Sequence, residues 1–364
     1  MRIALLGDIG LFGQYSVAED ADASQRFDAV AEYLRDFDLV VGNLEVPFVS
    51  DAPTVGQKSA YLQSDPRNVE LLRRLGVHAV TLANNHAMDF GRRGIEQTMH
   101  ALDKANIDHF GVDDRSMAVD TAGGRVRLRG YCSFTANPLG VQRASGRPGI
   151  NRFVLPEVEA LLEADRSAGF LPILSVHSGE EHVNYPNPVD IRVARRLADA
   201  GPLVYYGHHP HVVQGIETRG HALLAYSLGN FCFDDVYTPR SSEPLVRQSE
   251  NNKLGLILEL EVKDAELVGH RHMPVFGGPK GLELHCNDET ATIVAERSAA
   301  LQMPLDELSA LRDRELKAYR DARRKRRDLQ WYLRRLNWNS VGILVRARLN
   351  RQAHHHTVVR HLHG

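Results

Sequence analysis

Short apolar runs alternate with amphipathic stretches through the first 235 residues, and this alternation limits the possible folds more than any other feature of the sequence. Apolar residues that recur every three to four positions indicate helices, whereas short, uninterrupted apolar runs indicate buried strands. Alternation of strands and helices is typical of an α/β sheet with parallel strands. The predicted strands are residues 2–7, 38–42, 78–82, 125–131, 170–176 and 203–206, and the predicted helices are residues 24–36, 66–75, 92–105, 156–168 and 188–200.

The pattern changes after this region. Residues 253–262 and 266–273 predict a strand pair joined by a turn, and the glycine-rich stretch 276–281 indicates the end of the domain. We therefore expect one α/β domain over residues 1–285. A helical, strongly basic extension is expected over residues 286–364.

Composition restricts the class of protein. With 43% hydrophobic and 25% charged residues, the chain is globular rather than disordered. No apolar run approaches the roughly 18 residues that a membrane-spanning helix requires. Cys132, Cys232 and Cys286 are odd in number and far apart, which favours reduced thiols over disulfides. We therefore expect a cytoplasmic protein, either free in solution or peripheral at the inner face of the membrane.

Residues of the types that bind metals follow five of the predicted strands. In an open α/β sheet, ligands bind beyond the carboxyl ends of the parallel strands, because the loops converge there. Each group alone has an ordinary structural explanation, such as a turn or a buried histidine. The occurrence of all five groups at the same position, directly after a predicted strand, indicates one shared site. The residues are Asp8; Asn43 and Glu45; Asn84, Asn85 and His86; His177, Glu180 and Glu181; and His208, His209 and His211.

The donor types predict the chemistry of this site. Imidazole, carboxylate and amide oxygen without thiolate suit Mn²⁺, Fe, Zn²⁺ or Mg²⁺ rather than a structural zinc site of the cysteine type. We expect one or two divalent ions, with manganese as the first choice. A carboxylate that bridges two cations about 3.5 Å apart supports metal-bound hydroxide at neutral pH, which hydrolyses phosphoesters and, less often, amides.

In their order and spacing, these motifs resemble those of the CapA family, which includes poly-γ-glutamate and capsule biosynthesis proteins. The resemblance covers roughly residues 1–275. It implies a calcineurin-like metallophosphoesterase fold, which is an αββα sandwich, here followed by the helical basic extension. The matching segments are 7–8 (Gly-Asp), 43–45 (Asn-Leu-Glu), 83–91 (ANNHAMDFG), 177–181 (His-x-Gly-x-Glu), 207–217 (GHHPHVVQGIE) and 226–231 (YSLGNF).

The resemblance also implies roles for individual residues. Asp8 and His211 are expected to bind the first metal, with Glu45 as the bridging acid. Asn85, His177 and His209 are expected to bind the second metal. The residues expected to orient the imidazoles or to face the substrate are Asn43, Asn84, Glu180, Glu181, His208 and Asn230.

His86 is expected to donate a proton to the leaving group. Asp8 and Glu45 are the further residues we expect to take part in catalysis.

The sequence departs from the pattern at three points. Metallophosphoesterases usually begin with Asp-x-His, whereas Gly10 stands in place of that histidine and leaves the first metal with fewer ligands. Ser178 stands where the family typically has tryptophan. Many members carry an N-terminal membrane segment and work outside the membrane, whereas this chain begins at the first strand. For that reason we expect the cytoplasm rather than the exterior.

The basic C-terminal segment, residues 312–364, contains 15 Lys and Arg against 4 Asp and Glu, whereas residues 1–311 contain 29 against 42. One long charged helix is predicted over residues 306–336. One interpretation is a solvated helix that packs on the domain. Another is contact with an anionic membrane surface, with Trp331 and Trp338 at the interface. Nucleic acid is disfavoured, because no nucleic-acid-binding motif accompanies the charge.

Two functions are compatible with these features. The first is a metal-dependent hydrolase of capsule or poly-γ-glutamate biosynthesis, whose substrate is an anionic polymer or a phosphoester. The second is a non-catalytic, metal-stabilised accessory or binding module of a polymer synthesis complex. Retention of His86 beside Asn85 favours the hydrolase, whereas the missing histidine at position 10 favours the accessory module.

Overall fold

The computed structural model describes residues 1–325 apart from 56–57, 59, 134–135, 137–148 and 239–240, and beyond residue 325 it describes only 342 and 345. The part of the predicted helix 306–336 that follows residue 325, together with Trp331 and Trp338, lies outside the described residues.

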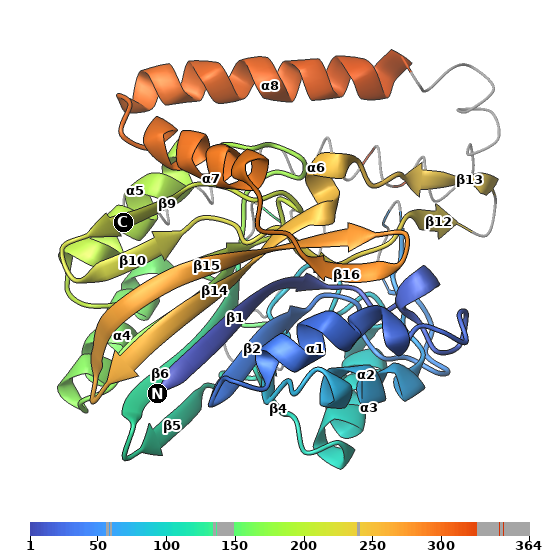
Figure 1. Ribbon diagram of the computed structural model, residues 1–364, viewed down its shortest axis with the longest axis horizontal. Helices are drawn as coiled ribbons and strands as arrows, with labels where there is room; N and C mark the ends of the chain where they lie inside the picture. The colour runs from blue at the N-terminus through green and yellow to red at the C-terminus, as the bar shows by residue number, and fades with distance from the viewer. Residues whose placement is uncertain are drawn as a thin grey trace.

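Two β-sheets face each other at the centre of the molecule (Figure 1). The larger has the strand order β16-β15-β14-β1-β2-β3-β4, with β11 beside β1, and the second has the order β5-β6-β7-β8-β10-β9. The larger sheet contains β1 (Arg2–Ile9), β2 (Leu39–Leu44), β3 (Ala79–Thr81), β4 (Asp108–Phe110), β11 (Asn230–Cys232), β14 (Leu254–Lys263), β15 (Glu266–Gly278) and β16 (Gly281–Leu284). The second contains β5 (Met117–Thr121), β6 (Gly124–Cys132), β7 (Leu171–His177), β8 (Val204–His208), β9 (Ile216–Arg219) and β10 (Ala222–Ala225).

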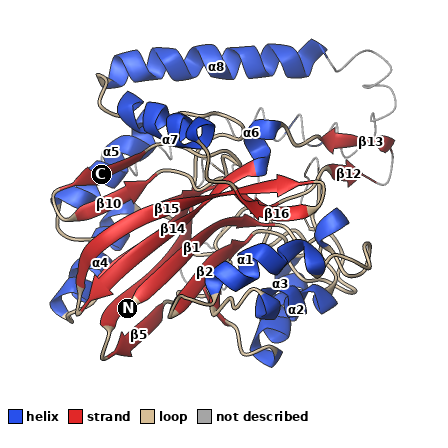
Figure 2. Cartoon of the chain, viewed as in Figure 1, coloured by secondary structure: helices blue, strands red, loops and turns tan. Residues whose placement is uncertain are grey.

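Helices cover the outer faces of both sheets (Figure 2). On the larger sheet lie α1 (Asp28–Leu34), α2 (Val69–Arg74) and α3 (Gly91–Lys104), and on the second sheet lie α4 (Leu155–Ser167) and α5 (Pro188–Asp199). One buried cluster combines residues of both sheets, and two others combine each sheet with its helices. The predicted αββα sandwich is therefore confirmed.

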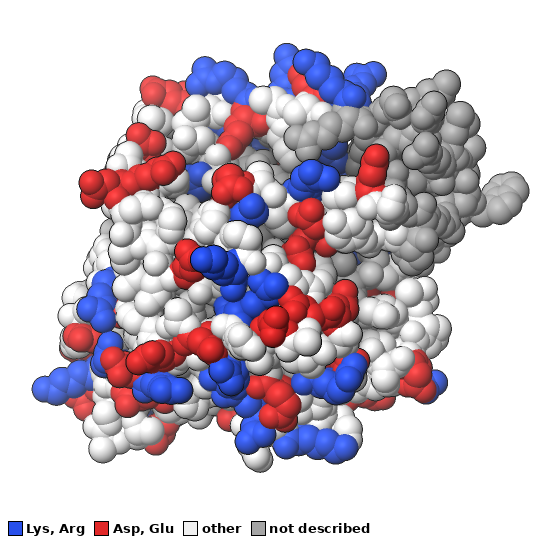
Figure 3. Space-filling view, turned by 45° about the vertical axis from the view of Figure 1, so that its right-hand side comes forward, with Lys and Arg blue, Asp and Glu red and all other residues white. Residues whose placement is uncertain are grey.

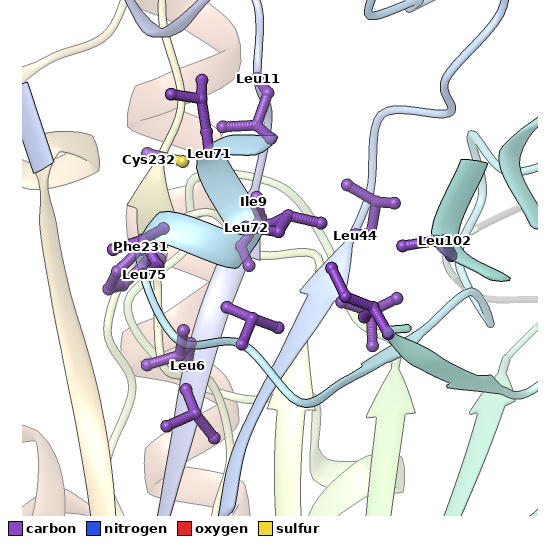
Figure 4. Close-up of a cluster of buried hydrophobic side chains, with 14 of the residues drawn as sticks. Leu6, Ile9, Leu11, Leu44, Leu71, Leu72, Leu75, Leu102, Phe231 and Cys232 are labelled. Carbon is purple, nitrogen blue, oxygen red and sulfur yellow. The ribbon is translucent and has the colours of Figure 1, made fainter. Parts of the chain in front are cut away.

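Strand β1 shows how the sequence builds these layers. Ile3 and Leu5 belong to the cluster between the sheets, whereas Ala4 and Leu6 belong to the cluster under α1–α3. This alternation follows from the two-residue period of a strand. Because both faces are buried, the strand is apolar from Ile3 until it reaches Asp8. Figure 4 shows leucines of α2 packed beside Leu6 and Ile9.

The glycine-rich stretch 276–281 forms part of a hairpin of the larger sheet. It does not end the sheet: β15 continues to Gly278 and a tight turn leads into β16. Gly281 has a φ of 134°, and its Cα approaches the backbone of Arg26 so closely that a Cβ would lie 2.4 Å from the carbonyl oxygen. The glycines thus serve a hairpin whose last strand, β16, ends at Leu284.

The C-terminal helices α7 (Asp288–Ala300) and α8 (Leu305–Lys325) pack on the sandwich, and α8 crosses the top of the view in Figure 1. Val294 joins the cluster between the sheets, and Leu301 and Leu308 join the cluster outside the second sheet.

The described α-helices and strands are completed by a short strand pair, β12 (Val236–Thr238) and β13 (Ser241–Val246), and by the single-turn α6 (Glu250–Lys253). Within the described residues, no helix combines the length and the apolar character needed to cross a membrane.

Candidate metal centre

The carboxyl ends of strands from both sheets meet at one buried point. Asp8 lies near the end of β1 and pairs with Asn43 of β2 and with Asn230 of β11. From the second sheet, His177 ends β7 and is paired with His208 at the end of β8. The strand ends thus gather residues that lie up to 222 positions apart in the chain, from Asp8 to Asn230.

Glycines allow this close approach of backbones. At Gly7, a Cβ would lie 2.2 Å from the carbonyl oxygen of Gly229, and at Gly207 it would lie 1.9 Å from that of Tyr226. A side chain at either position would displace the neighbouring strand. The glycine before Asp8 and the glycine before His208 are therefore structural requirements of the site.

Two groups of ligand atoms share one carboxylate. The first group is Asp8, Glu45 and His211, and the second is Glu45, His177 and His209; within each group the ligand atoms lie within 4.8 Å of one another. Glu45 Oε1 is 3.5 Å from His211 Nε2 and 3.8 Å from His177 Nε2. All of these residues are buried. Asn85 joins the second group, since its Oδ1 lies 2.9 Å from His177 Nε2.

The unsatisfied atoms of this cluster fit divalent cations. Among the described residues, both carboxylate oxygens of Glu45 and Nδ1 of His209 are buried without a hydrogen-bond partner. Burial raises the pKa of Glu45 well above its usual value, against the opposing effect of His211. A buried carboxylate without donors is stable in its ionised form only with a positive charge beside it. The set of carboxylate, imidazole and amide oxygen donors suits a divalent metal, as expected from the sequence.

The protonation state of two of the three histidines, His177 and His209, agrees with ligation. Burial, followed by the neighbouring histidines, lowers the pKa of His177 well below its usual value, and burial lowers that of His209 to about 4. These imidazoles are therefore neutral at pH 7, which is the form that binds metals. Burial also disfavours the charged form of His211, but Glu45 and Asp8 raise its pKa to about 9. The two carboxylates thus attract positive charge to this point.

Asparagine side chains hold the first group in place. Asn43 Nδ2 donates to Asp8 Oδ1 at 2.8 Å, and Asn84 Nδ2 donates to Asn43 Oδ1 at 3.1 Å. Asn230 Oδ1 lies 2.8 Å from His211 Nδ1, and His208 Nδ1 lies 3.0 Å from Asp8 Oδ1. These four residues lie where we expected groups that orient the ligands.

The two consecutive glutamates point to different partners. Glu181 faces the imidazoles: partial removal from solvent acts to raise its pKa, but His209 and the neighbouring histidines lower it to about 2. Its side chain is 43% exposed. Glu180 points away from the imidazoles: its carboxylate pairs with Arg312 of α8 and lies 3.4 Å from Asn187 Nδ2. The reason is that the backbone turns after Gly179, whose φ is 98°.

His86 lies beside the centre in contact with a buried carboxylate. Its Nδ1 is 2.7 Å from Oδ2 of Asp89, which is fully buried. Asp89 also pairs with Lys58, which donates to the backbone oxygen of Asn85. Asp89 was not among the predicted site residues, although its spacing of three residues from His86 in a turn is a usable signal.

The backbone is strained in the ligand loop, which is residues 209–211 directly after β8. His209 has a φ of 96° and His211 a φ of 54°, values that residues other than glycine rarely adopt. Such conformations cost about 1–3 kcal/mol each and occur where the surroundings fix them. Here the backbone N–H of His209 donates to Asp8 Oδ2 at 3.2 Å. The strain directs both imidazoles toward the same cluster.

His182 and Asn252 also belong to the site, although no sequence pattern distinguishes them as candidates. Asn252 Nδ2 lies 2.8 Å from His182 Nδ1 and donates to the backbone oxygen of His211 at 2.8 Å. Only the tertiary structure brings α6 beside the ligand loop, because 41 residues separate Asn252 from His211.

Adding Mn²⁺ to the chelated protein is expected to raise its melting temperature by about 5 °C at a concentration 100-fold above the dissociation constant, because the ion binds only the folded cluster. The measurement is thermal unfolding with EDTA and with Mn²⁺. His209→Ala should lose most of this increase, whereas His100→Ala, at an exposed position on α3, should keep it. An equal increase in both variants would contradict the site.

Most of the chain matches a family of known proteins. The family model described as "Bacterial capsule synthesis protein PGA_cap" matches residues 2–235, which contain every residue of the two ligand groups. The chain belongs to this family. The CapA resemblance inferred from the sequence motifs is thereby confirmed.

Individual members of the PGA_cap family are similar at moderate identity. The capsule biosynthesis protein CapA of Bacillus anthracis is 28% identical over 68% of this chain and 63% of its own length. The PGA biosynthesis protein CapA of Bacillus subtilis is 31% identical over 68% of this chain and 67% of its own length. The chain thus spans about two thirds of these relatives. A protein of Mycobacterium tuberculosis described as a "Probable polyglutamine synthesis accessory protein" is 32% identical over 54% of this chain and 56% of its own length.

Among solved structures, a 5'-nucleotidase precursor from Thermus thermophilus is similar with a TM-score of 0.45 and 16% identity, over 82% of this chain and 58% of that protein.

Proposed function

We propose that the protein is a divalent-metal-dependent hydrolase of capsule or poly-γ-glutamate biosynthesis that cleaves a phosphoester, or an amide or ester of an acidic polymer. The observation that carries this proposal is the sharing of Glu45 between two buried ligand groups, with the His86–Asp89 pair beside them. A binding site alone does not require a proton donor at that position.

Asp8, Glu45 and His211 would hold one cation, and Glu45, Asn85, His177 and His209 the other. A bound pair of divalent cations lowers the pKa of water and stabilises the charge that develops in phosphoryl transfer. Asn43, Asn84 and Asn230 fix the ligands in orientation. His86, held through Nδ1 by Asp89, leaves Nε2 available to donate a proton to the leaving group.

We further propose manganese as the resident metal, with iron, zinc or magnesium as alternatives, because all accept these donors. The proposed location is the cytoplasm or the inner face of the membrane. The charge of the basic C-terminal segment supports an anionic membrane surface as a second partner. We do not propose nucleic acid as a partner.

A non-catalytic accessory module is the second candidate function. Gly10 supports it, because this position lacks the histidine that would add a ligand to the first group. A relative described as an accessory protein is also consistent with it.

Metal analysis of the purified protein, combined with hydrolysis assays with added Mn²⁺, separates the two functions. For the hydrolase we expect bound divalent metal and turnover of bis(4-nitrophenyl) phosphate that EDTA abolishes and Mn²⁺ restores. Phosphomonoester and γ-glutamyl substrates are tested in parallel. Bound metal without turnover of any of these compounds would favour the accessory module.

A further inference from the structure

Helix α8 is anchored to the loop that follows the ligand His177. Arg312, which is only 5% exposed, pairs with Glu180, and Glu315 accepts hydrogen bonds from the backbone and side-chain nitrogens of Asn184. The N···O distance of the backbone hydrogen bond is 3.0 Å. A buried arginine with a carboxylate partner is a specific contact, because either charge alone would be costly to bury. The position of α8 relative to this loop is therefore defined by paired polar groups.

The same face of α8 continues to the metal centre. Tyr319 lies one turn beyond Glu315, and its ring is 5.0 Å from that of His182. The ring of His182 is in turn 6.2 Å from that of the ligand His211. Residues spaced three and four positions apart share one side of a helix, so Arg312, Glu315 and Tyr319 form a single contact stripe.

Arg323 is the next residue of this stripe, one turn beyond Tyr319, and it is exposed. Its charge acts on His182, whose pKa is lowered to about 4 by burial first and then by His211 and Arg323, against the raising effect of Glu181. Figure 3 shows Lys and Arg side chains along the upper edge of the molecule, where α8 lies in Figure 1. The positive charge of Arg323 thus lies at the outer end of a row of rings, Tyr319 and then His182, that leads to the ligand His211.

We propose that His182, Tyr319 and Arg323 form a subsite that binds an anionic group of the substrate next to the bond that is cleaved. The partly exposed ring of Tyr319, which packs on the largely buried His182, provides a face for the substrate chain. The guanidinium of Arg323 has the fork geometry that matches a carboxylate or a phosphate. That the occupant is the polymer substrate rests on the proposed function. Helix α8 lies beyond residues 2–235, so the subsite adds selectivity outside the part of the chain that the family model matches.

Binding of labelled oligo-γ-glutamate, measured by fluorescence anisotropy, tests the subsite. Arg323→Gln is expected to weaken binding by about three- to five-fold, which is the upper part of the range for one exposed ion pair. Tyr319→Ala should also weaken it. Arg314→Gln is the matched control, because it removes the same charge from an exposed position that helical periodicity places on the opposite side of α8. A labelled polyphosphate is measured in parallel to distinguish a phosphate from a carboxylate as the preferred group.

The measurements are made with Mn²⁺ and repeated with EDTA. The ratio of dissociation constants between variants then does not depend on turnover of the polymer. Equal weakening by Arg314→Gln and Arg323→Gln would overturn the subsite, as would the absence of binding of both polymers to the unsubstituted protein. Binding that depends on Arg323 in a protein without hydrolytic activity would support the subsite and reject the hydrolase. Circular dichroism verifies that each variant is folded.

Discussion

Glu45→Gln is expected to lower the turnover of bis(4-nitrophenyl) phosphate by about 10³-fold and to reduce bound metal, because one side chain serves both ligand groups. The amide keeps the shape of the side chain but removes the charge that attracts the cations. Metal content and the rate with saturating Mn²⁺ are the measurements. Glu32→Gln, at an exposed position on α1, is the control and should change neither.

The same substitution should not destabilise the metal-free protein. Burial raises the pKa of Glu45, which means that the fold penalises the ionised carboxylate, and the amide carries no such penalty. We therefore expect the melting temperature in EDTA to be equal to or above that of the unsubstituted protein. A large fall in EDTA would show that Glu45 is structural rather than a ligand.

His86→Asn is expected to lower kcat by about 10²- to 10⁴-fold while metal content stays unchanged, since His86 contributes a proton rather than a ligand. The loss should be smaller for a phosphodiester with a more acidic leaving group, because such a group departs without protonation. Asp89→Asn should have a smaller effect in the same direction, since Asp89 acts by orienting His86.

The measurement is the dependence of kcat on the pKa of the leaving group for each variant. A loss that is the same for all leaving groups, or that comes with loss of metal, would exclude His86 as the proton donor. His100→Ala again serves as the control.

Much of the centre was predictable because parallel strands present their carboxyl ends at one edge. Asp8, Glu45, Asn85, His177 and His209 follow predicted strands, and the structure brings all of them together. The fold followed from the same pattern, since an apolar strand such as β1 must be covered on both faces.

Other features depend on information that periodicity does not contain. Glu180 and Glu181 are neighbours, and only the turn at Gly179 determines which of them faces the histidines. His182 contacts Asn252 through a pairing of distant segments. The short strands β4 and β9 were missed because they offer too few residues to show an alternation.

The ligand groups draw on both sheets, with Asp8 and Glu45 on the side of the larger sheet and His177, His209 and His211 on the side of the second. A bound ion would therefore cross-link the two halves of the sandwich. The sheets could then separate only after the ion dissociates, so the metal would slow unfolding as well as shift its equilibrium. The lifetime of the folded protein in the cell would depend on the supply of that metal.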